Sequence, residues 1–499
     1  MPQLIISFII KGDIERGIKM VDAELLKKCK QDFDAKLPLY MTMQRYYDGH
    51  TDALEKYQMI TKRANTKVRC NFIQKFVNEE SSYCMGNKVT YTSHSGNPDV
   101  VEDIRFNFRH WREKHNKELC KQSLIFNEAY ELYYIDSNGL FNSLICTPLD
   151  SYILQDDYGN VILFIRFWTK KFDTMKQLYA DVYTVDTIEH YSVVGDVFTP
   201  ITPSTDEIVK GNNNSSTGFN NITGIGPVNN NADVNVFSQV PVGIVNIGTM
   251  DESLYAMLKG LEDGYETNLS DMVNEISDFR NAYLVFKNCK LDDKTKDENG
   301  KTQLDRMKEL GVMNLPGQNT DAKWLIKEIN DSFVQNTLNT LEDKMYQLSS
   351  HINNNEKLVS NTSSLALRNR LIGLEEKCTN NIQALIDCIK VRLKFLFEYL
   401  KIKQNKDYDW KDIDIKITPN IPTDDLMTSQ IISQLNGKLS TKTGLAQLSF
   451  VDNPDNEMKE LQKENEANNI GNDLLNSSGN GGDTGGKAKS TVPKSNTAD

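Results

Sequence analysis

The sequence predicts an α+β protein built from several regions of one 499-residue chain. Two observations indicate this class. Short β-rich runs joined by turn residues occupy much of the first half, and long stretches with apolar residues at every third or fourth position occupy the second half. Hairpins and long helices in separate parts of a sequence are typical of α+β folds, whereas a parallel α/β sheet needs alternating strands and helices.

The first 250 residues are predicted to combine helices with an antiparallel sheet. Residues 63–85 carry apolar side chains at helical spacing, and Gly86 ends this pattern before the strand-like residues 88–91. From residue 128 onward, β-rich runs are joined by turn sequences such as residues 157–160, which favour hairpins. The expected strands are residues 130–135, 144–147, 152–155 and 161–168.

Two polar stretches have the composition of disordered chain. Residues 211–231 contain eight Asn and four Gly, and residues 467–499 are similarly rich in Asn, Gly and Ser. Such segments bury too little apolar surface to offset the entropy lost on ordering. We expect the first to be a disordered insertion and the second a disordered tail.

Three long amphipathic helices are predicted after residue 250, at residues 251–280, 328–348 and 363–403. A β-rich segment lies between the first two, and a polar break with three consecutive Asn residues precedes the third. The first helix has an apolar stripe that runs from Leu254 to Ile276 and Phe279. We expect these stripes to be packed within one subunit or between subunits.

Charge is distributed unevenly along the chain. There are 57 Lys and Arg against 69 Asp and Glu, a net charge of -12, which argues against a protein that coats nucleic acid with its whole surface. Residues 251–280 contain eight acidic and two basic side chains, whereas residues 364–403 contain four acidic and eight basic. Opposed charge on successive helices fits either pairing between subunits or one helix facing a polyanion.

The sequence carries no motif typical of catalysis. His110 and His115 are five residues apart, which does not match H-E-x-x-H, and the Gly224 and Gly226 pair lacks the third glycine of a dinucleotide site. No nucleophile elbow or Walker-type phosphate loop occurs. We therefore predict a protein that is no enzyme and has no cofactor and no metal site.

The sequence also carries no signal for a membrane span or for disulfides. The apolar run at residues 4–10 is too short to span a membrane and lacks the flanks of a signal peptide, so we expect a buried strand or the start of a helix. The eight cysteines are scattered without a C-x-x-C pair. This pattern is typical of reduced, mostly buried cysteines in an intracellular protein.

Several short motifs follow one another in a fixed order between residues 40 and 466. Residues 83–91 are similar to a "Y-x-x-G-x-P-V" strand with Lys88 in place of Pro, and residues 128–136 to "G-x-A-Y-E-L-x-Y-x-D" with Asn127 in place of the first Gly. Residues 276–285, 324–330 and 363–368 add three further motifs, the last with Ser364 in place of Gly. In this order they resemble the portal proteins of tailed bacteriophages, in the branch found in long-tailed phages of Gram-positive hosts.

The resemblance implies a portal fold and a ring homo-oligomer around a DNA channel. It implies an α/β wing, a long-helix stem, a small α/β clip, a long kinked helix and an α-helical crown. The implied regions are a wing at 1–250 with the insertion at 211–231, stem helices at 251–280 and 328–348, a clip at 281–327, a tunnel loop at 349–362, the kinked helix at 363–403, a returning wing strand at 404–419, a crown at 420–466 and a tail at 467–499.

The resemblance also implies a function. The protein would form a ring of about a dozen copies at one capsid vertex, as the channel for packaging and ejecting viral DNA. Its clip would bind the large terminase subunit and later head-completion or adaptor proteins, with major capsid and scaffolding proteins as further partners. It would be assembled in the host cytoplasm and reside in the virion, and an acidic stem would suit a channel through which DNA slides.

Three groups of candidate residues follow from these regions. We expect the tunnel loop to contact DNA loosely, the clip to dock terminase and the basic side chains of the long helix to pair with neighbouring subunits. The tunnel-loop candidates are Ile352, Asn353, Asn354, Asn355, Glu356 and Lys357; the clip candidates are Lys290, Asp292, Asp293, Lys294 and Trp324; the intersubunit candidates are Lys390, Arg392, Lys394 and Lys401.

Two other functions stay open on the residues alone. One is a sequence-independent DNA-binding protein in which the basic helix at residues 364–403 lies along DNA. The other is a metal-dependent nuclease that uses acidic clusters such as Asp292 and Asp293, although no set of ligands is spaced for it. For Trp324, we expect a place in the core of the clip more than a direct contact with terminase.

Overall fold

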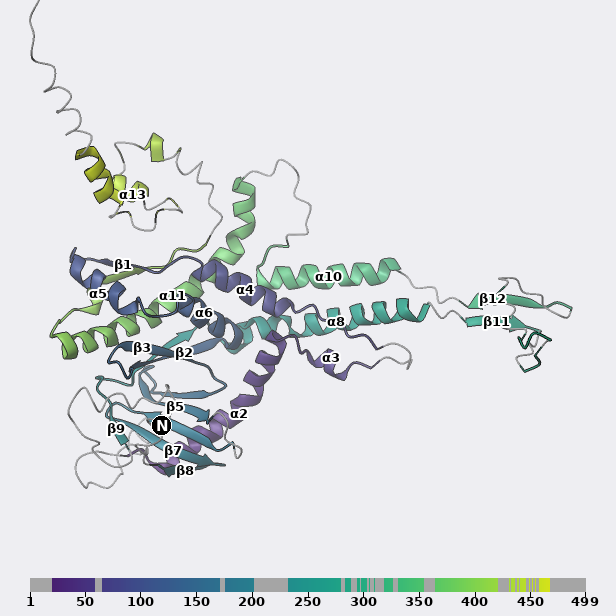
Figure 1. Cartoon of the computed structure of the whole chain (residues 1–499), viewed down its shortest axis with the longest axis horizontal. Coiled ribbons are helices and arrows are strands. Elements are labelled where there is room, and N and C mark those ends of the chain that lie inside the picture. Colours follow the sequence, from purple (N-terminus) through teal and green to yellow (C-terminus); the bar gives the residue numbers. More distant parts are fainter. Residues whose placement is uncertain are drawn as a thin grey trace, which may run out of the picture. The chain divides into compact units, whose positions relative to one another are not determined.

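The computed structural model has the α+β class that the sequence predicts. The chain divides into two units, Met1–Asn420 and Ile421–Asp499, whose elements are labelled in Figure 1. The predicted insertion at 211–231, the tail at 467–499 and the apolar run at 4–10 lie outside the described residues. The structure describes residues 20–58, 65–170, 176–201, 232–279, 283–288, 294–296, 298–302, 305, 309, 318–325, 331–353 and 364–420, and in the second unit 430, 432–435, 438, 440–445, 448, 451, 454 and 457–466.

Four of the five described N-terminal helices begin at a residue whose side chain caps them, and the helix at residues 115–126 starts without such a cap. Asp22 accepts a hydrogen bond from the Glu24 N–H (3.0 Å), and Asn97 accepts one from the Asp99 N–H (3.0 Å) next to Pro98. Short polar caps and an N-terminal proline satisfy or remove the N–H groups that a helix start leaves unpaired. These helices are α2 (Ala23–Tyr47), α3 (Asp52–Lys56), α4 (Phe72–Met85), α5 (Pro98–Phe108) and α6 (His115–Phe126).

Helix α4 is shorter than the helix predicted at residues 63–85. It starts at Phe72 because Asn71 has a left-handed φ of 51° and its Oδ1 accepts the Gln74 N–H (3.2 Å). Residues 65–71 are not helical. The apolar spacing therefore continued past the true start of the helix, and Val68 belongs to a separate segment described below.

The predicted hairpins are present. At the turn formed by residues 136–140, Asp136 Oδ1 accepts the N–H groups of Asn138 (2.9 Å) and Leu140 (3.0 Å), and Gly139 supplies a φ of 72°. All described strand pairs are antiparallel. A three-stranded sheet has the order β10 (Val242–Asn246), β2 (Glu128–Ile135), β3 (Phe141–Cys146), and a larger sheet has the order β4 (Ser151–Gln155), β5 (Val161–Thr169), β6 (Leu178–Tyr183), β7 (Thr187–Val194), β8 (Val197–Pro200), with β9 (Ala232–Val234) also on β7.

Two further strand pairs join distant parts of the sequence. The strand β1 (Thr90–Ser93) pairs with β13 (Ile413–Lys416), so a strand is present where one was expected within residues 404–419. The β-rich segment between the first two long helices forms β11 (Tyr283–Lys287) and β12 (Asp321–Leu325), which pair with each other.

Asn127 adopts the left-handed backbone conformation that favours the glycine it replaces in the motif at residues 128–136. Its φ of 67° is left-handed, a conformation that asparagine tolerates better than most other residues. Its Nδ2 donates to the carbonyl oxygens of Gly248 (2.7 Å) and Thr249 (2.9 Å). The substitution therefore keeps the turn between α6 and β2.

Apolar side chains of α2 cover one face of the larger sheet. Leu26, Cys29 and Phe33 are buried against strand residues that include Ile165 and Phe167. A second cluster, which includes Tyr130, Leu132 and Phe164, joins the three-stranded sheet to the larger one. The larger sheet is therefore covered on both faces, by α2 on one and by the three-stranded sheet on the other.

The three predicted long helices are present. They are α8 (Leu254–Phe279), α10 (Asp331–Ser349) and the 41-residue α11 (Ser364–Gln404). Helices α8 and α10 lie side by side, and α11 changes direction along its length (Figure 1). The Ser253 Oγ accepts the Ala256 N–H (3.2 Å) at the start of α8. Short 3-10 helices precede α8 (Met250–Glu252) and β13 (Trp410–Asp412).

The described part of the second unit is helical. It contains α13 (Thr441–Leu445), where the Ser440 Oγ accepts the Thr443 N–H (3.2 Å), and a helical stretch at residues 457–466. Short helices are the kind of structure that the motifs implied for residues 420–466.

Candidate functional site

One face of α8 carries a row of buried polar side chains. Glu262, Glu266, Ser270 and Asn274 are each 0% exposed. Their spacing of four residues places them on the same side of the helix. Polar groups buried this completely normally have hydrogen-bond partners, and each of the four has one.

The partners are backbone N–H groups at every second position of residues 66–72. Because successive N–H groups of an extended chain point to opposite sides, these alternating contacts mean that residues 66–70 run extended along α8, in the opposite direction to the helix. Asn71, with its left-handed φ, then turns the chain into α4. We call this set of contacts the amide ladder. Its contacts are Phe72 N to Glu262 Oε1 (2.8 Å), Cys70 N to Glu266 Oε1 (2.8 Å), Val68 N to Ser270 Oγ (3.0 Å) and Thr66 N to Asn274 Oδ1 (2.7 Å).

The contacts of the ladder stay aligned along its length because the repeat distance of the helix nearly equals that of the extended chain. Four residues of an α-helix advance about 6 Å, and two residues of extended chain advance about 6.6 Å. At one end, Asn274 Nδ2 also donates to the Thr66 carbonyl oxygen (2.8 Å), as a strand partner would. In the middle, Glu266 Oε2 accepts a further hydrogen bond from the Thr51 hydroxyl (2.6 Å). The polar face of α8 thus acts toward this segment as the edge of a sheet would.

Burial changes the pKa of Glu262, one of the two acids in the ladder. Burial, together with the carboxyl group of Glu266, raises the pKa of Glu262 to about 8. The Glu262 Oε2 atom is buried and has no hydrogen-bond partner in the described structure, while Oε1 accepts the Phe72 N–H. Glu262 is therefore mostly neutral at pH 7.

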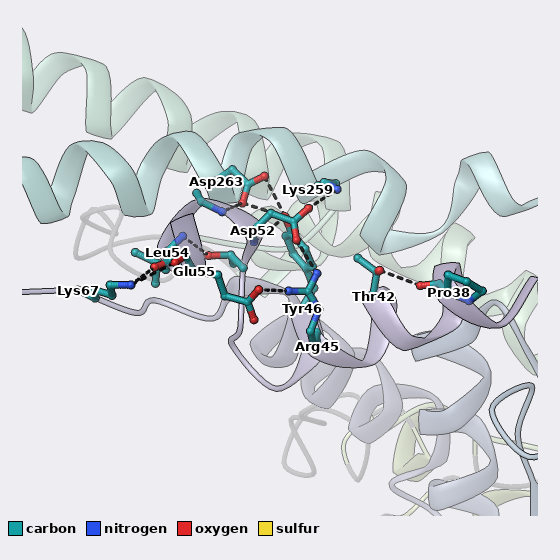
Figure 2. A network of polar contacts seen from close by, with 12 residues as sticks. Pro38, Thr42, Arg45, Tyr46, Asp52, Leu54, Glu55, Lys67, Lys259 and Asp263 are labelled. Atoms are coloured by element: carbon teal, nitrogen blue, oxygen red, sulfur yellow. Dashed lines mark hydrogen bonds and ion pairs between the residues drawn. The ribbon is translucent and has the colours of Figure 1, made fainter. Parts of the chain in front are cut away.

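A second set of contacts joins the first half of α8 to α2 and α3 (Figure 2). The Tyr46 hydroxyl donates to Asp263 (2.9 Å), and both Lys259 (2.9 Å) and Arg45 (2.5 Å) bind Asp52. Hydrogen bonds from Lys259 and Arg45 hold the pKa of Asp52 at about 2. Charged and phenolic groups thus fix α8 to the helix that covers the sheet.

These contacts correct the interpretation of the acidic helix. The sequence suggested that the excess acid at residues 251–280 would suit a surface along which DNA slides. Glu262 and Glu266 are instead buried against their own chain, and Asp263 and Asp271 accept hydrogen bonds from tyrosine hydroxyls of the same chain. The interpretation is wrong for Glu262 and Glu266, because their charge does not reach a surface.

A buried ion pair lies where α11 packs on β2. Arg392 Nε donates to Glu131 Oε2 (2.9 Å), and the two side chains are 1% and 0% exposed. His115 Nε2 lies 2.7 Å from Glu131 Oε1, and the Arg392 guanidinium carbon lies 5.1 Å from the centre of the Trp111 ring. Burial alone would raise the pKa of Glu131, but Arg392 and His115 hold it at about 2. We call Glu131, Arg392 and His115 the ion-pair hub.

The hub corrects the prediction for Arg392. This residue was expected to pair with an acidic residue of a neighbouring subunit, but it is buried and pairs with Glu131 of its own chain. For the other three candidates, pairing between subunits stays a prediction. Within the chain, Lys390 contacts Asp387 (2.9 Å), Lys394 contacts Gln239 (2.7 Å) and Lys401 contacts Asp407 (2.7 Å).

Some of the tunnel-loop and clip candidates lie within the described residues. Asn353, next to Ile352, places its Nδ2 3.5 Å from Glu342 Oε1 of α10. Lys294 is exposed, and Trp324 lies on β12 opposite Leu284 of β11. The remaining candidates lie outside the described residues: Asn354, Asn355, Glu356, Lys357, Lys290, Asp292 and Asp293.

Sequence reasoning missed the ladder and the hub. The polar residues of the ladder carry a signal, because four of them recur at a spacing of four residues along a helix. For Glu131, the signal is a single acid within the apolar run of β2. Neither signal identifies the partner, which lies far away in the sequence.

The described part of the chain shows no features of a metal site, a membrane-spanning helix or a disulfide. Among those residues, no three His, Cys, Asp or Glu side chains are grouped so as to hold a metal ion. None of the described helices has the length and apolar character needed to cross a membrane. The described cysteines are free thiols, and all are buried except Cys70, which is half-buried.

Comparisons with known proteins give one family. The model of the family described as "Phage portal protein, SPP1 Gp6-like" matches residues 26–471. A chain from the "Neck of empty GTA particle computed with C6 symmetry" is similar with a TM-score of 0.43 and 8% identity, over 75% of this chain and 88% of that one. A chain from the "Virion of native gene transfer agent (GTA) particle" has a TM-score of 0.41 and 9% identity, over 81% and 91%. No curated protein matches the chain.

Proposed function

Because the chain belongs to the SPP1 Gp6-like family of phage portal proteins, we propose that about a dozen copies form a ring around a channel for viral DNA. The function of the protein is structural, as a portal and head–tail connector of the virion. The family match over residues 26–471 is the observation that carries the proposal.

The elements can be assigned to the regions of a portal subunit. We assign α8 and α10 to the stem, the β11–β12 pair to the clip and α11 to the long kinked helix. The sheets with α2 to α6 form the wing, and β13 returns to it from the end of α11. Residues 420–466 form the crown. The order of long helices and hairpins along the chain supports this assignment.

The clip would contact the packaging machinery. We assign the large terminase subunit to it during packaging, and head-completion or adaptor proteins afterwards. Lys294 and Trp324 are candidates for these contacts because both lie in or beside the β11–β12 region. Major capsid and scaffolding proteins would contact the wing during assembly in the host cytoplasm.

The segment at 349–362 would be the tunnel loop, and its charge can be tested. Lysine in place of Asn353, Asn354 and Asn355 adds cations that grip phosphates regardless of sequence. We expect slower or stalled packaging, measured as DNA protected per capsid over time. Glutamine at the same positions preserves the polarity without charge and should package normally. Equal packaging by the lysine variant would contradict loose contact between this loop and DNA.

The alternative of a sequence-independent DNA-binding protein is not supported. Arg392, near the middle of the basic stretch of α11, is buried and paired with Glu131 instead of facing a ligand. Negative-stain images or mass photometry of the purified protein separate the two functions. A ring that binds DNA weakly supports the portal, whereas a monomer with tight, salt-sensitive DNA binding would overturn it.

A further inference from the structure

The amide ladder uses only one edge of the extended segment that it holds. The N–H groups of Thr66, Val68 and Cys70 point at α8. Those of Lys67 and Arg69 point to the opposite side by the alternation of an extended chain. In the described structure, neither of these two N–H groups has a hydrogen-bond partner.

This outer edge is open. Residues 65–67 and 69 are exposed, and no proline interrupts the segment. The Lys67 side chain folds toward α3, where its Nζ donates to the Leu54 carbonyl oxygen (2.5 Å), so it does not cover the edge (Figure 2). The outward N–H and C=O groups of Lys67 and Arg69 lie about 6.6 Å apart and are a template for another extended chain.

The chemistry of the edge indicates what kind of chain fits it. Donors and acceptors alternate along an extended backbone, so a second extended backbone satisfies both, whereas phosphate groups would satisfy the donors alone. Lys67 and Arg69 make the segment basic, while the whole chain has a net charge of -12. A second copy of this chain therefore carries a net charge opposite in sign to that of the segment.

A ring brings such a partner into place. Neighbours in a ring meet through two different surfaces, so an open edge on one copy can meet an unrelated segment of the next. Such an arrangement would leave the edge exposed only in the isolated chain.

We propose that the outer edge formed by Lys67 and Arg69 pairs with an extended segment of the neighbouring copy in the ring, an inference that rests on the proposed function. The stem helix α8 then holds the segment from one side through its side chains. The neighbouring subunit holds it from the other side through its backbone. The segment becomes the central strand of a joint between subunits.

Hydrogen exchange at single-residue resolution tests this on the wild-type ring. If the edge is paired, the amides of Lys67 and Arg69 exchange as slowly as those of Thr66, Val68 and Cys70. Fast exchange at Lys67 and Arg69, with slow exchange at the other three, overturns the proposal. In that case the two basic side chains act only to keep an open edge from pairing non-specifically.

A matched pair of proline variants gives a second test. Arg69→Pro removes an outward N–H, whereas Val68→Pro removes the neighbouring N–H that binds Ser270. We expect Arg69→Pro to keep the wild-type circular dichroism and to raise the concentration for half-assembly about tenfold or more, because each contact between subunits loses a hydrogen bond. Val68→Pro should lower the melting temperature of the chain itself.

The outcomes separate this inference from the proposed function. A folded Arg69→Pro protein that assembles like the wild type overturns the open-edge proposal and leaves the portal function intact. A wild-type chain that forms no ring contradicts the proposed function. If Arg69→Pro does not fold, the exchange pattern of the wild-type ring decides the question alone.

Discussion

The amide ladder and the ion-pair hub both bury carboxylic acids completely, but their partners differ. In the ladder, Glu262 meets a neutral backbone N–H and a second acid, and its pKa rises to about 8. In the hub, Glu131 meets Arg392 and its pKa falls to about 2. The comparison teaches that burial alone does not decide whether an interior acid is charged. A full positive charge within hydrogen-bond distance does.

The two regions should also respond differently to mutation. The hub concentrates its stabilisation in one pair, so loss of either partner leaves a charge in the interior. The ladder spreads its stabilisation over four contacts with neutral amides, so loss of one side chain leaves a neutral group unpaired. Four variants, with two controls, test this contrast.

The largest effect is expected for Arg392→Met. It leaves Glu131 buried without its cation, which should lower the free energy of unfolding by about 3–5 kcal/mol. Chemical denaturation followed by circular dichroism measures this change. Lys401→Met, at an exposed ion pair on the same helix, is the control and should change stability by less than about 0.5 kcal/mol. Equal effects of the two variants would show that the hub is no stronger than a surface pair.

A smaller effect is expected for Glu266→Ala in the ladder. It removes the acceptor of two hydrogen bonds, from Cys70 N and from the Thr51 hydroxyl, which should cost about 2–3 kcal/mol. Ser270→Ala removes one acceptor and should cost about 1 kcal/mol. Thr267→Ala is the control because its hydroxyl bonds only within α8. A loss of all helical signal on Glu266→Ala would mean that the ladder fails as a unit.

The smallest effect is a dependence on pH. The pKa of Glu262 is higher in the folded chain than in the unfolded one, so its stabilising contribution is complete below the ordinary glutamate pKa of about 4.5, declines as pH rises above that value and is gone above about 8. Between pH 7 and 8.5 the wild type should lose about 1 kcal/mol more than Glu262→Gln, which cannot ionise. Melting temperatures of both proteins across this range measure the difference. Parallel curves would place the Glu262 pKa below this range.

Local structure followed from the sequence because its causes are local. The spacing of apolar residues predicts α8, and the turn residues beside Gly139 predict a hairpin that is present. The ladder could not be predicted in this way, since Phe72 and Glu262 are 190 residues apart. The apolar stripe of α8 also predicted burial incorrectly for some residues. Ile276 is 56% exposed in the single chain, whereas the polar row of α8 is buried.

Counts of charged residues along the sequence were also an incomplete guide, because they do not show which charges are buried. They described residues 251–280 as acidic and residues 364–403 as basic, and both counts are right. They cannot distinguish a buried side chain such as Arg392 from an exposed one such as Lys401. That distinction depends on which distant segment packs against the helix. It determines whether a charge can act on a ligand or only on its own chain.

The geometry of the amide ladder has a mechanical consequence. A pull along the axis of α8 loads all four contacts at once, because each lies across the direction of sliding. A pull that peels residues 66–72 away from the helix loads the contacts one after another, starting from one end. The joint is therefore strong in shear and weak in peeling. In the stem that we propose for α8, such an anchor should transmit axial force from passing DNA to the proposed wing without slipping.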